Sequence, residues 1–461
     1  MSDPTSTGLF DPLFSTDAMR AIFSDRTRLQ RMLDFEAALA RAEARAGVIP
    51  DSAISAIESG CRAELFDLEA LARAVGLAGN SAIPMVKALT ALVAKSDPEA
   101  GRYVHWGATS QDAMDTGLVL QIRDALAIFE RDLESLCGVL ARLTEDHKAT
   151  PLAGRTWLQQ APPVTLGLKA AGWLSASERH RARLHELRSR VLVVQLGGAA
   201  GTLAALGEHG LQVAENLAED LHLALPDLPW HSHRDRVAET ATTLGLLVGT
   251  LGKIARDVSL LMQTEVGEAF EPAEAGKGGS STMPHKRNPV GCAAVLSAAI
   301  RVPALVSVML AAMVQEHERG MGNWHAEWET LPEICRLASG ALAQIHHMLG
   351  GLEVDPARMR RNLELTRGLV LAEAVTMALA RHIGRMPAHH LIQQASRQAT
   401  EQARHLREVL SDEPQVTAHL SADELQRLFD PANYTGLAEA FAERALAARA
   451  DALAHSAGES G

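Results

Sequence analysis

GKGGSSTMPHKRNP, at residues 276–289, interrupts two long apolar segments with glycines, adjacent serines and cations. Packing alone does not explain such a composition. The three glycines let the backbone adopt positive φ and turn its N–H groups toward one point, and Asn288 before Pro289 is typical of a helix N-cap and first turn. Together with Lys286 and Arg287, these backbone donors favour the binding of an anion. We interpret the stretch as a mobile catalytic loop and not as a basic linker.

Residues 280–289 of this loop are similar to the signature of the fumarase/aspartase superfamily, whose members form or break a bond β to a carboxylate through an aci-carboxylate intermediate. The resemblance implies that Ser280 is the catalytic base, as its alkoxide, and that Lys286 and Asn288 hold the substrate carboxylate. Serine is a very weak acid, so backbone N–H groups and cations must favour its charged form. The resemblance implies chemistry without cofactor or metal. The other substrate-binding residues that it implies in the loop are Ser281, Thr282 and Met283.

A second polar segment, HWGATS at residues 105–110, precedes a long apolar pattern. Taken alone, His105 fits a hydrogen-bonded structural histidine, and Thr109 or Ser110 fits a helix cap. The combination resembles the first shared segment of the superfamily. That resemblance implies that all three side chains contact a substrate carboxylate, and it further implies substrate contacts for Gln159 and Arg319.

A third segment, GRTW at residues 154–157, departs from the superfamily, most members of which have histidine at the fourth position. Members that expel an amine or water use that histidine as acid/base, and Trp157 cannot do so. A carboxylate leaving group, whose acid has a pKa near ~4, needs no proton to depart. This condition is met when a lactone opens or when a muconate carboxylate adds to its own conjugated double bond. Trp157 is then either a wall of the site or an ordinary core tryptophan.

Two further tryptophans, Trp324 and Trp328, stand where nucleotide-binding members carry a serine and an arginine for the phosphate. The whole chain, including residues 154–157 and 230–236, resembles members of the superfamily that cyclise a carboxylated muconate, a small tricarboxylate, to its lactone, and this resemblance implies the same reaction. The alternatives are an adenylosuccinate-type C–N lyase and an enzyme for a sulfonated muconate. An alternative of another class is a crystallin-like structural protein without activity, which retention of Ser280, Lys286 and Asn288 disfavours.

Composition predicts an all-α fold. The chain has 461 residues, 47% of them hydrophobic and only 4% aromatic, and alanine and leucine suit helices better than strands. Apolar residues recur at helical spacing over 27–46, 118–143 and 237–262. With the resemblance, this predicts a three-domain fumarase/aspartase-like fold: residues 1–114, a central long-helix bundle over 115–365, and a small helical domain over 366–461. The resemblance also implies a homotetramer whose sites draw on three subunits.

The formal net charge of −12 argues against nonspecific binding to nucleic acid or to an anionic membrane. Four widely spaced cysteines suggest neither a disulfide framework nor a zinc site, and no signal peptide or membrane span is evident. We expect a soluble cytoplasmic protein. The glycine-rich segment 195–201 lacks the dinucleotide-binding spacing and is interpreted as close helix packing or a site wall.

Overall fold

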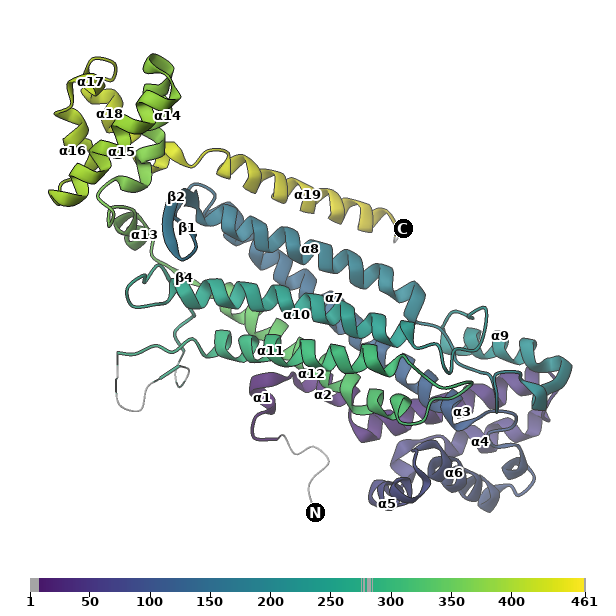
Figure 1. The fold of residues 1–461 in the computed structure, drawn as a ribbon. Coiled ribbons are helices and arrows are strands. Elements are labelled where there is room, and N and C mark those ends of the chain that lie inside the picture. The colour runs from purple at the N-terminus through teal and green to yellow at the C-terminus, as the bar shows by residue number, and fades with distance from the viewer. Residues whose placement is uncertain (1–7, 275, 277, 280–282, 284, 460–461) are drawn as a thin grey trace. The chain divides into compact units, whose positions relative to one another are not determined.

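The computed structural model describes residues 8–274, 276, 278, 279, 283 and 285–459, and these are mostly helical (Figure 1). The predicted all-α fold is confirmed. Strands in the described residues form two antiparallel pairs, β1 (Pro151–Thr156) with β2 (Gln159–Thr165) and β3 (Ala269–Phe270) with β4 (Glu353–Val354). The helical pattern did not predict the first pair.

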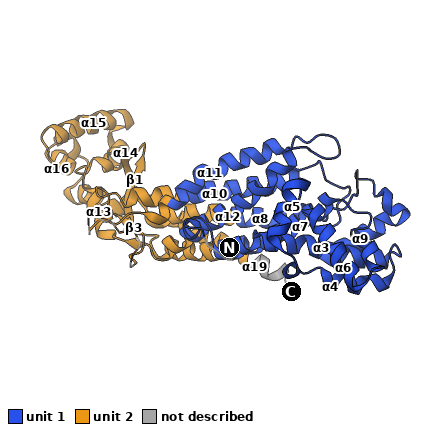
Figure 2. Ribbon diagram, turned by 90° about the horizontal axis from the view of Figure 1, so that it is seen from below, with its two compact units in different colours: residues 1–133, 180–252, 294–344 blue, residues 134–179, 253–293, 345–461 orange. Residues whose placement is uncertain are grey.

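The chain divides into two compact units, coloured separately in Figure 2. Unit 1 comprises residues 1–133, 180–252 and 294–344, and unit 2 comprises residues 134–179, 253–293 and 345–461. Five long helices contribute residues to both: α7 (Ser110–Asp146), α8 (Leu166–Val191), α10 (Asp235–Leu261), α11 (Val290–Ala312) and α12 (Asn323–Gly350). The three-domain division proposed from the sequence remains a prediction.

Shorter helices complete unit 1. The α-helices are α1 (Asp11–Phe14), α2 (Asp17–Ile22), α3 (Asp25–Arg45), α4 (Ile54–Gly60), α5 (Leu68–Ala78), α6 (Ala82–Ser96) and α9 (Gly210–Leu221). The 3-10 helices are η1 (Asp51–Ala53), η2 (Ala63–Leu65), η3 (Ala100–Tyr103) and η4 (Ala204–His209). Helix α3 was predicted over 27–46. The Ser24 side chain accepts from the Thr27 N–H at its start, and Gly47, at φ 74°, follows its end.

Two of the apolar patterns in the sequence, those over 118–143 and 237–262, are confirmed as parts of helices α7 and α10. Helix α7 has 37 residues, which at ~1.5 Å per residue makes it about 55 Å long. Their apolar stripes are buried, which confirms the interpretation of both as core. The buried stripe residues include Leu126, Leu133, Leu140, Leu244, Val248 and Leu251.

Unit 2 contains both strand pairs and the C-terminal helices. These are α13 (Pro356–Leu363), α14 (Ala372–Ile383), α15 (Arg385–Glu401), α16 (Leu406–Ser411), α17 (Pro414–Thr417), α18 (Ala422–Leu428) and α19 (Ala438–Glu459), with η5 (Leu369–Leu371) and η6 (Pro431–Tyr434). Residues of α14, α15 and α16 share a hydrophobic core with Val416 and Leu425. Ser421 and Glu424 form a capping box at the start of α18.

Helix α3 carries an acidic side chain that is buried in unit 1 without a hydrogen-bond partner in the described residues. Glu43 is 0% exposed, and neither carboxylate oxygen has a hydrogen-bond partner in the described residues. Burial, followed by the charge of Glu36, raises the pKa of Glu43 to about 9. The side chain is therefore a neutral carboxylic acid at pH 7, since a buried carboxylate without partners would be costly.

Glu43 gives the stability of the fold a defined pH dependence. An unfolded glutamate loses its proton near pH ~4.3, so between there and about pH 9 folding takes up a proton. The free energy of unfolding should fall by up to about 1.4 kcal/mol per pH unit across this window. We expect Glu43→Gln to remove that slope, so that its melting temperature exceeds the wild-type value by more at pH 8 than at pH 5.

Thermal unfolding followed by circular dichroism between pH 5 and 9 measures this difference. Glu64→Gln, the same change at an exposed residue of unit 1, serves as the control and should leave the wild-type slope intact. Parallel curves for wild type and Glu43→Gln would show that Glu43 is ionised in the folded protein.

Candidate active site

Asp112, in the first turn of α7, fixes the polar segment that contains His105. Its carboxylate is 0% exposed and accepts hydrogen bonds from the backbone N–H groups of Thr109, Gly197 and Gly198, each at 2.9 Å. It also lies 2.7 Å from Nε2 of His231. One buried carboxylate therefore holds the turn before α7, the glycine-rich segment and His231 together within unit 1.

The glycine-rich segment 195–201 packs closely, but against the turn before α7 and His231 and not between two helices. A Cβ on Gly198, which has a φ of 68°, would lie 3.0 Å from the carbonyl oxygen of Gly107. A Cβ on Gly197 would lie 2.9 Å from Cε1 of His231. Only glycine lets this backbone lie so close to the turn that follows His105.

One turn further along α7, Asp115 forms a buried ion triad. Arg234 donates from Nη1 to Oδ2 of Asp115 at 2.6 Å and from Nε to Oε1 of Glu327 at 2.9 Å, and all three residues are 2% exposed or less. Burial would lower the pKa of Arg234, but the two carboxylates raise it. Removal of one partner from such a group costs about 3–5 kcal/mol. The triad therefore locks α7 and α12 to the segment before α10.

Gln111 connects this triad to Arg319, a predicted substrate contact. Its Nε2 donates to Oδ2 of Asp115 at 3.0 Å, and its Oε1 accepts from Nε of Arg319 at 2.9 Å. Trp324 donates from Nε1 to Oδ1 of the same Asp115 at 3.2 Å. Nη2 of Arg319 is buried and has no hydrogen-bond partner in the described residues. Arg319 therefore lies beside Gln111 at the start of α7, next in sequence to Ser110, and its Nη2 group remains able to donate to a ligand.

His105 is held from behind by a buried glutamate. Its Nδ1 lies 2.6 Å from Oε1 of Glu36, which is 2% exposed, and its backbone adopts a φ of 60°. Burial would lower the pKa of His105, but Glu36, and with it Asp112, raises the pKa above the usual value. The described geometry therefore favours an imidazolium at this position.

Thr109 and Ser110 do not cap α7 through their side chains. The Thr109 N–H is taken by Asp112, and within the described residues no hydrogen bond involves either hydroxyl. Both residues are partly exposed. Their hydroxyls are therefore not used as caps, and their contact with a substrate carboxylate remains a prediction.

Trp157 lies at the tip of the β1–β2 hairpin in unit 2. It is 97% exposed and Leu158 is 77% exposed, so the core alternative for Trp157 is wrong. Thr156 pairs with Gln159, an exposed predicted contact, which leaves a two-residue turn with φ of 54° and 62°. Asparagine and glycine usually occupy such turns, and positive φ is unfavourable for tryptophan and leucine. A strained turn that presents two apolar side chains to solvent calls for a functional reason.

The hairpin is anchored by a second buried acid. Arg155 binds Glu268 with both nitrogens of its fork, at 2.6 Å and 2.9 Å, and Glu268 is 0% exposed. Asn362 of α13 donates from Nδ2 to the same carboxylate at 2.8 Å. Arg155 pairs with Gln160 next to the turn, so the bidentate geometry fixes the end of the hairpin from which Trp157 projects.

The signature loop is closed at its base by Asn288, whose N–H donates to the Gly278 carbonyl at 2.8 Å. A Cβ on Gly278 would lie 2.6 Å from the Asn288 oxygen, so this approach requires glycine. Lys286 is exposed and Met283 is 41% exposed, as solvent-facing ligands of a substrate would be. The three predicted residues Ser280, Ser281 and Thr282 lie outside the described residues.

Two groups predicted to bind an anion, the start of α11 and Arg287, already bind carboxylates of the protein itself. Helix α11 begins at Val290 and not directly after Asn288, and its first free N–H groups, those of Gly291 and Cys292, donate to the Glu271 carboxylate at 3.1 Å and 2.8 Å. Arg287 binds Glu353 at 2.8 Å. The prediction that the helix start and Arg287 hold an anion was therefore wrong, because Glu271, which follows β3, and Glu353 of β4 supply the negative charge.

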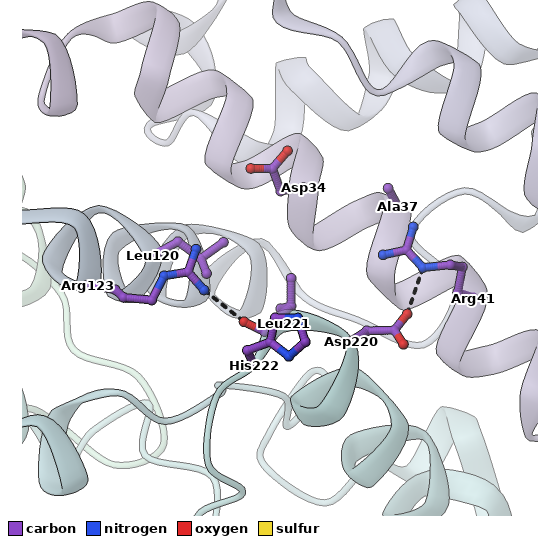
Figure 3. A pocket seen from close by; sticks show the side chains of 8 residues that line it. All are labelled: Asp34, Ala37, Arg41, Leu120, Arg123, Asp220, Leu221 and His222. Atoms are coloured by element: carbon purple, nitrogen blue, oxygen red, sulfur yellow. Dashed lines mark hydrogen bonds and ion pairs between the residues drawn. The ribbon is translucent and has the colours of Figure 1, made fainter. Parts of the chain in front are cut away.

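A hollow of about 270 Å³ in unit 1 does not coincide with these residues (Figure 3). Its two cations are engaged, Arg41 with Asp220 at 2.7 Å and Arg123 with the Leu221 carbonyl at 2.9 Å. It contains no residue that the sequence predicted to contact substrate. We therefore do not assign it as the active site.

The predicted site residues divide between the units. Unit 1 brings together His105, Thr109, Ser110 and Arg319 around the start of α7, and unit 2 carries Trp157, Gln159, Met283, Lys286 and Asn288 on the hairpin and the loop. Sequence reasoning missed the acids that position them. The i, i+4 spacing of Gln111 and Asp115, next to Asp112 on a face that is otherwise apolar, could have indicated buried polar contacts.

Comparisons with known proteins agree with the signature. A family model described as "Lyase" matches residues 14–304, and one described as "Adenylosuccinate lyase C-terminus" matches residues 368–445. The chain is 66% identical over 447 residues to 3-carboxy-cis,cis-muconate cycloisomerase of Pseudomonas aeruginosa, with 97% of each chain covered. It is 63% identical over 417 residues to the protein of that name from Pseudomonas putida, with 90% of this chain and 99% of the relative covered.

A solved structure shows the same similarity at the level of the fold. The crystal structure of 3-carboxy-cis,cis-muconate lactonizing enzyme from Pseudomonas putida superposes with a TM-score of 0.92 at 61% identity and covers 96% of this chain and 98% of its own. The resemblance inferred from residues 280–289 is confirmed, and the structural-protein alternative is set aside. The chain belongs to the lyase family, the fumarase/aspartase superfamily of enzymes.

Proposed function

We propose that the protein is a cofactor-free cycloisomerase that converts 3-carboxy-cis,cis-muconate to 4-carboxymuconolactone, a step in protocatechuate catabolism. The observation that carries the proposal is Trp157, which stands at an exposed hairpin tip where most members of the superfamily have an acid/base histidine. The relatives named above for this activity, at 66% and 63% identity, support the same assignment.

The proposed chemistry needs few groups. In the lactonising direction one carboxylate oxygen bonds to the carbon β to a second carboxylate, whose conjugated double bond supplies the electron pair that makes it an aci-carboxylate. The Ser280 hydroxyl then gives its proton to the α carbon. In the reverse direction the Ser280 alkoxide removes that proton, and the ring oxygen leaves as a carboxylate. The carboxylate departs without a proton, because its acid has a pKa near ~4.

A tricarboxylate requires several cations and donors, and the described residues offer them. Glu36 raises the pKa of His105, Arg319 keeps one buried N–H group without a partner, and Lys286 is exposed on the loop. Such donors stabilise the charge that develops on the carboxylate as it becomes an aci-dianion. Thr109 and Ser110 add hydroxyls in unit 1.

The two tryptophans of α12 argue against the nucleotide-binding alternative. Trp324 is 4% exposed, donates to Asp115 and packs edge-on against Trp328 with their centroids 5.0 Å apart. These indoles occupy the positions at which adenylosuccinate-type members bind a phosphate. An adenylosuccinate substrate would therefore lack its anchor.

We also infer a homotetramer with composite sites. Helix α11 has a mean hydropathy of 2.0 over its most apolar stretch, of which only 28% is buried, so length and composition alone would let it span a membrane. Ile300 is 77% exposed and Leu246 of α10 is 57% exposed. Family membership favours cover by other copies of the chain in a soluble, cytoplasmic bundle. The exposed Trp157 would then face a neighbouring subunit.

The role of Ser280 is tested by Ser280→Ala. Wild-type protein should consume the diene of 3-carboxy-cis,cis-muconate, seen as loss of ultraviolet absorbance, and the variant should be slower by on the order of 10²–10⁴-fold. Helical circular dichroism should be unchanged, and Ser411→Ala, on an exposed turn of α16, serves as the control. Near-normal turnover by the folded variant would remove Ser280 as the proton carrier.

The composite site is tested by mixing two inactive variants, Ser280→Ala and His105→Ala. If each site takes these residues from different subunits, random exchange should leave about a quarter of the sites intact, and activity should return. A mixture of Ser280→Ala with the double variant should stay inactive. An active monomer in sedimentation, or no recovery despite proven exchange of tagged subunits, would contradict the shared site.

A further inference from the structure

Helix α3 presents two acids to the interior of unit 1 where apolar residues would pack without cost. Glu36 and Glu43 lie two turns apart on one face and are 2% and 0% exposed. Three of their four carboxylate oxygens have no hydrogen-bond partner in the described residues. The fourth, Oε1 of Glu36, lies 2.6 Å from Nδ1 of His105. Buried acids are costly when unpaired, so this arrangement indicates a function other than stability.

The geometry of His105 leaves one nitrogen for a ligand. Its ring is 15% exposed, and Nδ1 is committed to Glu36. The backbone at φ 60°, just after η3, is a conformation that few residues other than glycine adopt. Only Nε2 can therefore bind a molecule that approaches from outside. A proton on Nε2 together with one on Nδ1 makes the ring a cationic donor.

We propose that Glu36 is a positioning residue that holds His105 as an imidazolium, so that its Nε2–H binds a carboxylate of the substrate. This rests on the proposed function for the identity of the substrate. Glu43, on the same face of α3, stays protonated and therefore adds no negative charge to the pair. The fixed ion pair orients the ring before substrate arrives, as second partners of functional histidines do elsewhere.

The charged groups around the pair agree with this assignment. Glu36 on α3 and Asp112 on α7 face His105 and raise its pKa against the effect of burial. Asp112 is shared with His231 and three backbone N–H groups, so Glu36 is the acid in direct contact with His105. Glu43 and the buried thiol of Cys61 are the titratable groups that interact with Glu36 from its other sides. Without Glu36, burial would favour a neutral imidazole.

Glu36→Gln tests the proposal by activity. The amide keeps the shape but removes the charge, so kcat/KM for the tricarboxylate should fall about tenfold, because a donor to the developing aci-dianion is weakened. The basic limb of the kcat/KM profile should move to lower pH by about one unit or more. Glu36→Asp should restore part of the profile. A purely structural role for Glu36 would lower the amount of folded enzyme without moving the profile.

Asp34→Asn provides a matched control. It removes the same charge from α3 two residues earlier, where the carboxylate is bound to Gln30 and Arg31 on the outside of the helix. Its kcat/KM and pH profile should stay at wild-type values. A shift equal to that of Glu36→Gln would show that the effect is general electrostatics and would overturn the proposal.

Titration of His105 by NMR decides the question without turnover. With ¹³C-labelled histidine, the His105 resonance is the one absent from His105→Gln, and its midpoint should be lower in Glu36→Gln than in wild type. If wild type fails to convert the muconate while this shift is present, the proposed function fails and the positioning role stands. Equal midpoints in wild type and Glu36→Gln would overturn the positioning role.

Discussion

The first turns of α7 impose the constraint on which unit 1 depends. Gln111, Asp112 and Asp115 are all buried there, and each must be hydrogen-bonded because α7 is otherwise packed in an apolar core. Asp112 accepts hydrogen bonds from backbone N–H groups of the glycine-rich segment. Asp115 accepts from the Arg234 guanidinium, and the Gln111 amide oxygen accepts from Arg319. Three segments far apart in sequence are thereby fixed to one helix start. These contacts also fix the positions of His105, Thr109 and Ser110.

In unit 2, buried acids on either side of the two-residue strand β3 likewise fix segments that are far apart in sequence. β3 is flanked by Glu268, which binds Arg155 next to the turn of the hairpin, and by Glu271, which caps α11. The hairpin and the end of the signature loop are thus set by acids from a single short segment. In both units, charge that would be costly if unpaired is used to hold backbone in place, while the side chains proposed to meet substrate stay exposed or keep donors unused.

Periodicity was enough to predict α3 and α10 within two residues and the existence of α7, because their buried faces repeat at helical spacing. The polar first turns of α7, from Ser110 onward, lay outside the apolar pattern, which began at residue 118. It was not enough for the hairpin at Trp157, since a tight turn of tryptophan and leucine contradicts ordinary turn preferences. Buried acids such as Glu36 and Glu43 read as surface residues in a sequence, and only packing reveals them. The prediction of an anion site at the start of α11 was wrong because this helix is capped by Glu271. That residue lies some twenty residues earlier in the chain, and no sequence pattern identifies it as a cap.

The central claim is that Trp157 leaves this enzyme without the acid needed to expel an amine but suits it to a carboxylate leaving group. The direct measurement compares kcat/KM of wild type and Trp157→His with 3-carboxy-cis,cis-muconate and with adenylosuccinate. We predict that wild type turns over only the muconate and that Trp157→His is slower on it without gaining adenylosuccinate cleavage, because Trp324 and Trp328 still leave the phosphate unbound. Efficient cleavage of adenylosuccinate by wild type, with no reaction of the muconate, would contradict the account.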